Sequence, residues 1–350
     1  MYKKLIYIVL LATASCIDPY ETRVDKGLQL LTVEGTITSK VGTHTVRLTR
    51  SDTYGSIFEG VVEPVTGATV IVKDDLGNVT LLGENVGSRG NYYTPADFAA
   101  IVGRSYTLQI QLVDGKVYTS LPEQVKDVPP IGNLTYQSER IPVEGEINDA
   151  SGVGFIVEVD DPEEESNFYY WRNSRATYVL ETRPELYIDP VTKAPAPKGC
   201  CPVCYKSETT GNNSFFIASD ENFNGLRTRI KAGFVLDDGL RFVNTFRVDL
   251  RQLSITAEAF RFLRLVKQQS ETRGSVFDPP PASIRGNMIS LDDPDEVVLG
   301  YFIAAGETSR RVYIKGTELD FRQNVGVVPD DCREVDDSVV NPPADWNPGE

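Results

Sequence analysis

Four cysteines in the second half of the chain are the residues with the clearest potential for chemistry. Cys200, Cys201 and Cys204 are clustered, and Cys332 lies near the C-terminus. In an oxidising compartment an even number of cysteines favours disulfide bonds, so we expect two. A bond between adjacent residues is strained, which favours pairings that join one of Cys200 and Cys201 to Cys204 and the other to Cys332. The long-range bond would tie the C-terminal tail to the middle of the chain.

A zinc site with four thiolate ligands is the alternative use of these cysteines. The segment Cys-Cys-Pro-Val-Cys at residues 200–204 supplies thiolates close together, as one half of such a site does. The second Cys-x-x-Cys half is absent from the sequence, so disulfides are favoured over zinc. We expect no metal at these cysteines and no cofactor elsewhere.

A weak candidate for calcium binding lies at Asp220, Asn222 and Asn224. Oxygen-bearing side chains on alternate residues, followed by Gly225, match the opening of a calcium loop. The twelfth position holds Lys231, where such a loop needs a bidentate glutamate. A polar turn therefore explains the segment better than a calcium site.

The sequence contains no recognisable catalytic constellation. His44 is the only histidine, which excludes multi-histidine metal sites, and its place on a predicted strand argues against a Ser-His-Asp triad or a Cys-His pair. Acidic residues are so numerous that a glycosidase pair of carboxylates cannot be located. The acidic run at residues 160–165 is more typical of a solvated turn than of a calcium site. We therefore expect a protein that is not an enzyme, and a carboxylate hydrolase is the weakest alternative.

A group of aromatic residues is a candidate for stacking against a ligand such as a sugar. Adjacent aromatic residues on a strand point to opposite faces of the sheet, so at least half of this group should lie in the core. The residues concerned are Tyr92, Tyr93, Phe168, Tyr169, Tyr170 and Trp171.

The N-terminal segment decides the compartment. Two lysines precede a short apolar run, and small residues lead to Cys16. The run is too short for a membrane-spanning helix, which needs about 20 residues. We expect residues 1–15 to be a signal peptide, Cys16 to be lipidated, and residues 16–28 to form a tether. A plain secretory signal and an accidental apolar start are the alternatives, and Thr13 departs from the leucine usual in lipoprotein signals.

Composition is that of a water-soluble, acidic body. The chain has 350 residues and a formal net charge of −15. Removal of the signal peptide takes away Lys3 and Lys4, which makes the net charge still more negative. An acidic surface repels nucleic acid and anionic headgroups, so we expect no nucleic acid partner. The length is enough for two domains with separate cores.

Alternating apolar residues and turn signals predict mainly β-structure. Short strands separated by turns, with no helical period, indicate an immunoglobulin-like β-sandwich over residues 29–130. A second β-rich domain is expected over residues 131–350, with a cysteine-bearing insertion at 184–213 and a C-terminal tail. Within it, Thr256 can cap an amphipathic helix from Ala257 to about Gln269 that lies on a sheet.

Several short motifs carry a family resemblance. The signal ending on Cys16 is followed by motifs at residues 31–35, 67–70, 103–108, 114–118, 286–289 and 299–302. Cys332 and the terminal Pro343-Ala344-Asp345-Trp346 are similar to the tail of the same proteins, although a closely following second cysteine is missing here. Over nearly the whole mature chain, the sequence resembles the domain-of-unknown-function family 4249 of Bacteroidota.

This resemblance implies an outer-membrane lipoprotein that is often encoded beside a TonB-dependent transporter, with no enzyme activity and no assigned functional residues. Acidic residues soon after Cys16 look like the signal that exports lipoproteins of the Bacteroidota to the cell surface. We therefore expect a surface-exposed, lipid-anchored binding or accessory subunit whose partner is a TonB-dependent β-barrel transporter. A structural or assembly component of an envelope complex is the alternative.

Overall fold

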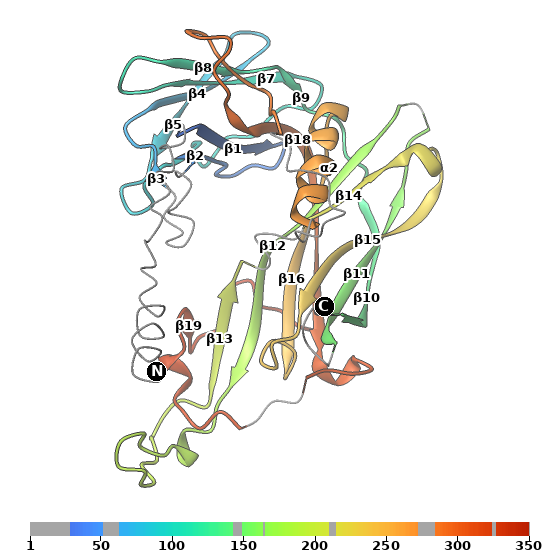
Figure 1. Cartoon of the computed structure of the whole chain (residues 1–350). Coiled ribbons are helices and arrows are strands. Elements are labelled where there is room, and N and C mark those ends of the chain that lie inside the picture. The colour runs from blue at the N-terminus through green and yellow to red at the C-terminus, as the bar shows by residue number, and fades with distance from the viewer. Residues whose placement is uncertain are drawn as a thin grey trace, which may run out of the picture.

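The computed structural model describes residues 29–51, 63–142, 149–163, 165–209, 215–271, 284–323 and 327–349. The expected signal peptide, lipidated Cys16 and tether lie outside the described residues. The expected fold class is confirmed, because the described chain is mainly β with one packed α-helix (Figure 1). Within these ranges no helix has the length and apolar character needed to cross a membrane.

The N-terminal half forms two facing sheets around a shared apolar core. One sheet contains β1 (Leu31–Thr38), β2 (Thr45–Arg50), β3 (Glu63–Pro64) and β6 (Asn91–Tyr93). The other contains β4 (Thr69–Asp74), β7 (Ser105–Gln111), β8 (Val117–Ser120) and β9 (Glu123–Gln124), and β5 (Val79–Glu84) pairs with both β4 and β6. Alternate residues of each strand, such as Val33 and Leu108, are buried between the sheets.

Two later segments complete this N-terminal sandwich. Strand β17 (Met288–Ser290) pairs with β8, and the first half of β18 (Leu299–Lys315) runs parallel to β1. The expected boundary at residue 130 therefore leaves out part of the sandwich. A parallel pair needs a long crossover, here the whole intervening chain, and such a pairing leaves no local signature in the sequence.

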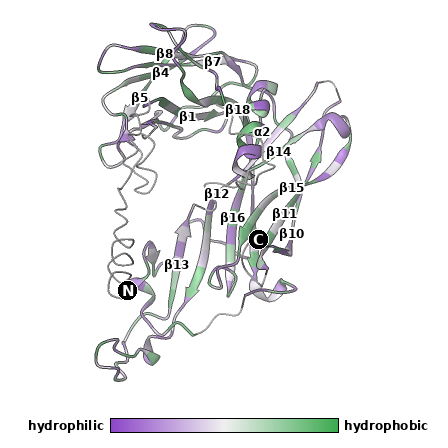
Figure 2. Ribbon diagram, viewed as in Figure 1, coloured by the Kyte–Doolittle hydropathy of each residue, from purple (hydrophilic) through white to green (hydrophobic). Residues whose placement is uncertain are grey.

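The second sandwich also has two sheets. Its larger sheet contains β14 (Phe216–Ser219), β12 (Phe168–Glu181), β13 (Val203–Glu208), β16 (Thr245–Ser254), the second half of β18 and β19 (Ser338–Val339). Its smaller sheet contains β10 (Ile131–Ile141), β11 (Ala150–Asp160) and β15 (Arg227–Leu236). Large aromatic and aliphatic residues fill the space between them, including Phe155, Trp171 and Phe246. Figure 2 shows hydrophobic residues along the strands of both sandwiches.

Strand β18 joins the two sandwiches without a break. Its residues up to Ala305 pair with β1, and from Gly306 onward they pair with β16. The two sandwiches therefore share one continuous strand, which connects them (Figure 1).

Helix α2 (Ala257–Glu271) packs on the larger sheet of the second sandwich. Thr256 caps it, because its hydroxyl accepts a hydrogen bond from the backbone nitrogen of Ala259. Ala259 and Leu263 are buried against the sheet. The expected capped amphipathic helix is confirmed. Short 3₁₀ helices occupy some of the described connections: η1 (Pro184–Leu186), η2 (Asp220–Asn222), η3 (Gly316–Glu318) and η4 (Cys332–Glu334).

Most of the candidate stacking aromatics belong to the cores. Tyr169 and Trp171 face the smaller sheet, whereas Tyr170 faces helix α2, and Tyr92 is buried in the first sandwich. Phe168 packs against Phe260 of the helix. Because four of the six rings are buried and Phe168 and Tyr93 are half-buried, the group does not form an exposed ligand platform.

Candidate functional site

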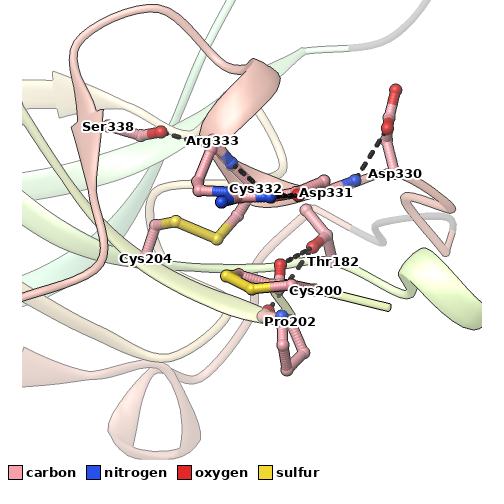
Figure 3. Close-up of a disulfide and its surroundings, with 10 residues drawn as sticks. Thr182, Cys200, Pro202, Cys204, Asp330, Asp331, Cys332, Arg333 and Ser338 are labelled. Carbon is pink, nitrogen blue, oxygen red and sulfur yellow. Dashed lines mark hydrogen bonds and ion pairs between the residues drawn. A yellow bond between two sulfur atoms is a disulfide. The ribbon is translucent and has the colours of Figure 1, made fainter. Parts of the chain in front are cut away.

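The described cysteines lie in one lobe at the end of the molecule opposite the N-terminal sandwich (Figure 1). We define this cysteine-bearing lobe as residues 184–208 with residues 327–340. Cys204 is bonded to Cys332, with their Cα atoms 5.7 Å apart, and Cys200 is bonded to Cys201 (Figure 3). The long bond therefore ties the tail to strand β13.

The expected pairing of these cysteines is wrong. Cys204 lies opposite Leu180 in the β12–β13 pair and is fully buried. The backbone nitrogen of Cys332 donates to the carbonyl oxygen of Cys201, 3.0 Å away, which holds Cys332 beside the strand. The Cα atom of Cys204 then lies at the usual distance for a disulfide from the Cα atom of Cys332. Cys200 therefore pairs with its neighbour Cys201.

Charged residues hold the tail next to the disulfides. The carboxylate of Asp331 accepts hydrogen bonds from the backbone nitrogen and the guanidinium of Arg333, which hold its pKa well below the usual range. Lys198 pairs with Asp330. The sulfur atoms of Cys200 and Cys201 lie within 4.8 Å of an Asp331 carboxylate oxygen. The zinc alternative would need the Cys200–Cys201 bond to be reduced first, because a disulfide provides no thiolate.

Peptide mapping without reductant checks this arrangement. We expect a digest of the oxidised protein to yield the peptide that carries Cys200, Cys201 and Cys204 joined by one crosslink to the peptide that carries Cys332. In the variant Cys204→Ala/Cys332→Ala that crosslink should be lost, and the peptide with Cys200 and Cys201 should have a mass two hydrogens lower than its reduced form. Free thiols at these four positions, or zinc bound in equal amount to the protein, would contradict the assignment.

The calcium candidate forms a polar turn between β14 and β15. Asp220 is buried, and its Oδ2 accepts a 2.6 Å hydrogen bond from the backbone nitrogen of Asn167. Asn222 ends the 3₁₀ turn η2, and the amide nitrogen of Asn224 donates to the carbonyl oxygen of Glu163. The carboxylate and amide at the two ends of the motif thus contact the protein's own backbone rather than a common point.

A buried carboxylate that the sequence does not single out lies where the two sandwiches meet. Glu123 of β9 is 2% exposed. Its oxygens accept hydrogen bonds from the Tyr301 hydroxyl (2.6 Å), the Thr256 hydroxyl (2.7 Å) and the Asn287 amide (3.4 Å). These partners come from β18, the cap of helix α2 and the segment before β17. Burial raises the pKa of Glu123 above its ordinary value.

A cavity opens beside this junction. It measures about 360 Å³, a size that suits a small ligand, and both sandwiches contribute to its lining. Gln124, Lys126 and Val125 line it from the first sandwich, and Glu165 and Asn167 line it from the second. Lys126 and Glu165 form a 2.8 Å ion pair across it. We call it the junction cavity.

The family model described as Domain of unknown function (DUF4249) matches residues 17–311. The chain belongs to the DUF4249 family. A search of curated proteins finds no match. The DUF4249 match covers the N-terminal sandwich and most of the second one and ends within β18, so Cys332 and the tail lie beyond it.

Two motifs of this DUF4249 chain meet at the junction. A Cβ on Gly300, whose φ is +87°, would lie 2.0 Å from the carbonyl oxygen of Val33, and a Cβ on Gly286 would lie 1.5 Å from the carbonyl oxygen of Gly300. The Asn287 amide bonds to both the backbone nitrogen and the carbonyl oxygen of Phe302. Glycine is needed at both positions because the backbone segments around Val33, Gly286 and Gly300 cross too closely to leave room for a side chain.

The buried acid makes a testable contribution to stability. The raised pKa of Glu123 means that the folded DUF4249 chain binds a proton more tightly than the unfolded chain. Stability from this group therefore falls as the pH rises above the ordinary value of 4.5. We expect Glu123→Gln to raise the melting temperature at pH 7 and to give a smaller gain at pH 4. The exposed acid Glu34 on β1 is the control, since Glu34→Gln should change stability little at either pH, and an equal gain from Glu123→Gln at both would contradict the account.

Proposed function

We propose that the protein is a lipid-anchored, surface-exposed subunit of the outer membrane that binds a ligand or serves as an accessory to a TonB-dependent transporter, without enzyme activity of its own. The observation that carries the proposal is the junction cavity, which is lined by two sandwiches held together through one continuous strand. Ligand sites are often found where domains meet.

The chemistry of the cavity suits binding. Its side chains offer amides at Gln124 and Asn167 and the ion pair of Lys126 with Glu165. The buried acids Glu123 and Glu307 do not line the cavity, and each is engaged by hydrogen bonds within the protein. A site of this kind can orient a polar ligand without supplying a nucleophile and base.

The anchoring part of the proposal rests on the N-terminal segment and on membership of the family. Lysines, a short apolar run and small residues before Cys16 are the pattern of a lipoprotein signal. Attached acyl chains hold a protein on a membrane at about 0.8 kcal/mol for each buried CH₂, so a multiply acylated Cys16 would be an effectively permanent anchor.

Replacement of Cys16 tests the anchor. We expect Cys16→Ala to move nearly all of the protein from the membrane fraction to the soluble fraction, because the acyl chains have no other attachment site. Cys200→Ala is the matched control and should stay in the membrane fraction. Protease added to whole cells should digest the unaltered protein if it faces outward. A membrane-bound Cys16→Ala protein would rule out lipid anchoring.

A structural role in an envelope complex is the second candidate. The cysteine-bearing lobe exposes several apolar side chains, among them Val191, which is 86% exposed, with Leu186, Ile188, Val327 and Val339. Exposed apolar side chains that come together in a contiguous patch mark protein contacts. An assembly role predicts stable co-purification with envelope assembly components, whereas an uptake role predicts a transporter together with a soluble ligand.

A further inference from the structure

The last part of the tail lies on the larger sheet of the second sandwich. We call residues 343–347 the tail segment; its backbone makes a turn in which the nitrogen of Trp346 donates to the carbonyl oxygen of Pro343 at 2.9 Å. The residues that receive it belong to strands β13, β16 and β18. Among residues 340–349, none is part of a helix or strand. A preformed surface of the sheet thus holds an irregular peptide.

Two guanidinium groups grip the carboxylate of the tail segment. Arg247 Nη1 donates to Asp345 Oδ1 at 2.9 Å, and Arg311 Nη2 donates to Asp345 Oδ2 at 2.7 Å. These bonds hold the pKa of Asp345 below its ordinary value. Asp249 orients Arg311 by accepting two hydrogen bonds from it. Paired guanidinium contacts of this kind recognise a carboxylate by geometry as well as by charge.

Aromatic side chains grip the neighbouring indole. The Trp346 ring meets Tyr205 and Tyr313 edge to face, with ring centroids 5.2 Å and 5.3 Å apart, and the Arg247 guanidinium lies 5.5 Å from the indole. The Tyr313 hydroxyl accepts a 2.8 Å hydrogen bond from the backbone nitrogen of Asn347. Edge-to-face rings and a cation over an indole are both favourable contacts.

The site is more buried than its occupant. The side chain of Arg247 is 2% exposed, whereas that of Asp345 is 55% exposed. The Nε atom of Arg247 is buried and has no hydrogen-bond partner among the described residues. The tail segment therefore accepts hydrogen bonds from Arg247 through Nη1 alone, while Nη2 donates to Thr177 and Nε is left over as a buried donor.

We propose that Arg247, Arg311, Tyr205 and Tyr313 form a receptor for a peptide in which an acidic residue precedes tryptophan, supplied by another polypeptide chain, and that the protein's own tail segment is a resident competitor. The proposal is independent of the transport function. The receptor groups are fixed on paired strands, whereas the tail segment beyond β19 is held through the side chains of Asp345 and Trp346 and the backbone of Asp345 and Asn347. The incoming peptide would replace the carboxylate, indole and turn of the tail segment one for one.

A full-length variant whose own tail segment can no longer occupy the site tests the receptor proposal; we call it the vacated variant. The variant Asp345→Ala/Trp346→Ala removes both gripped side chains, and a fluorescein-labelled peptide with the sequence of residues 341–349 is then titrated in by fluorescence polarisation. We expect the peptide to bind the vacated variant at least tenfold more tightly than the unaltered protein, whose tethered tail competes at an effective concentration of about millimolar. A peptide with alanine at both gripped positions should not bind.

Two further variants keep the test decisive. Asp345→Asn is the milder replacement and should give intermediate affinity, which covers the case in which the double variant fails to fold. Adding Arg311→Gln to the vacated variant should lower peptide affinity at least tenfold, and adding Tyr313→Phe should lower it less. Equal binding to the unaltered and vacated proteins, or no binding at millimolar peptide to a folded vacated variant, would overturn the proposal and leave the contact as an intramolecular clasp.

Discussion

Replacing both Cys204 and Cys332 with alanine is expected to lower the free energy of unfolding by about 5 kcal/mol. The bond joins residues 128 positions apart. In the chain-entropy model, a crosslink that closes so long a loop removes many conformations from the unfolded chain. Urea denaturation followed by tryptophan fluorescence measures the change as a lower midpoint, because Trp171 is buried in the second core.

The double replacement of Cys200 and Cys201 is the matched control for this experiment. These residues are adjacent, so their bond closes no loop of useful length, and its removal should cost far less stability. The bonds also differ in position, since Cys204 and Cys332 are fully buried. Equal losses in the two double variants would contradict the idea that the long bond stabilises the tail by loop closure.

Removing the carboxylate of Glu307 is expected to cost about 3 kcal/mol, the lower end of the range for breaking a buried ion pair. The Glu307 side chain is 1% exposed at the point where β18 passes between the sandwiches. It accepts hydrogen bonds from Arg251 at 2.7 and 2.5 Å and from the Thr38 hydroxyl at 2.7 Å. Glu307→Ala leaves the Arg251 guanidinium without this partner, and chemical denaturation at pH 7 measures the loss.

The pH dependence of the Glu307→Ala effect has a definite sign. Burial alone raises the pKa of Glu307, but the hydrogen bonds and charge of Arg251 bring it below the ordinary value of 4.5. A carboxyl group with a lowered pKa stabilises the folded protein at pH values above 4.5. This contribution to stability is lost as the pH falls through the pKa of the folded state. The gap between the unaltered protein and Glu307→Ala should therefore narrow in acid. Lys40→Ala is the control, since this exposed lysine lies 3.9 Å from Glu307 and should contribute little. A gap that widens in acid would contradict the ion-pair account.

Local patterns in the sequence predict local structure well. The period of Ala259, Phe260, Leu263 and Val266 and the cap at Thr256 suffice to place helix α2, because helix formation depends on neighbouring residues. Alternating strands indicate the mainly β class for the same reason. The motif that begins at Asp220 is also recognisable as a turn, because Lys231 stands at the twelfth position, where a calcium loop needs a glutamate.

The parts that join distant residues are not readable in this way. Strand β18 pairs with both β1 and β16, and neither pairing can be predicted from the local sequence of β18. Glu123 and Arg247 are charged residues on strands, a pattern that normally indicates exposure, and only the tertiary fold buries them. The pairing of Cys204 with Cys332 likewise depends on where the tail meets β13. In each case the decisive contact is long-range.

Co-purification from native membranes tests the central claim most directly. The lipidated protein, carrying an affinity tag beyond the tail segment, is extracted in mild detergent and captured, and mass spectrometry quantifies what accompanies it. The Cys16→Ala protein, purified in parallel, controls for contacts formed after lysis. We predict that a TonB-dependent β-barrel transporter accompanies the lipidated protein in near-equal amount. Recovery of the protein alone, or with envelope assembly components in place of a transporter, would contradict the accessory role.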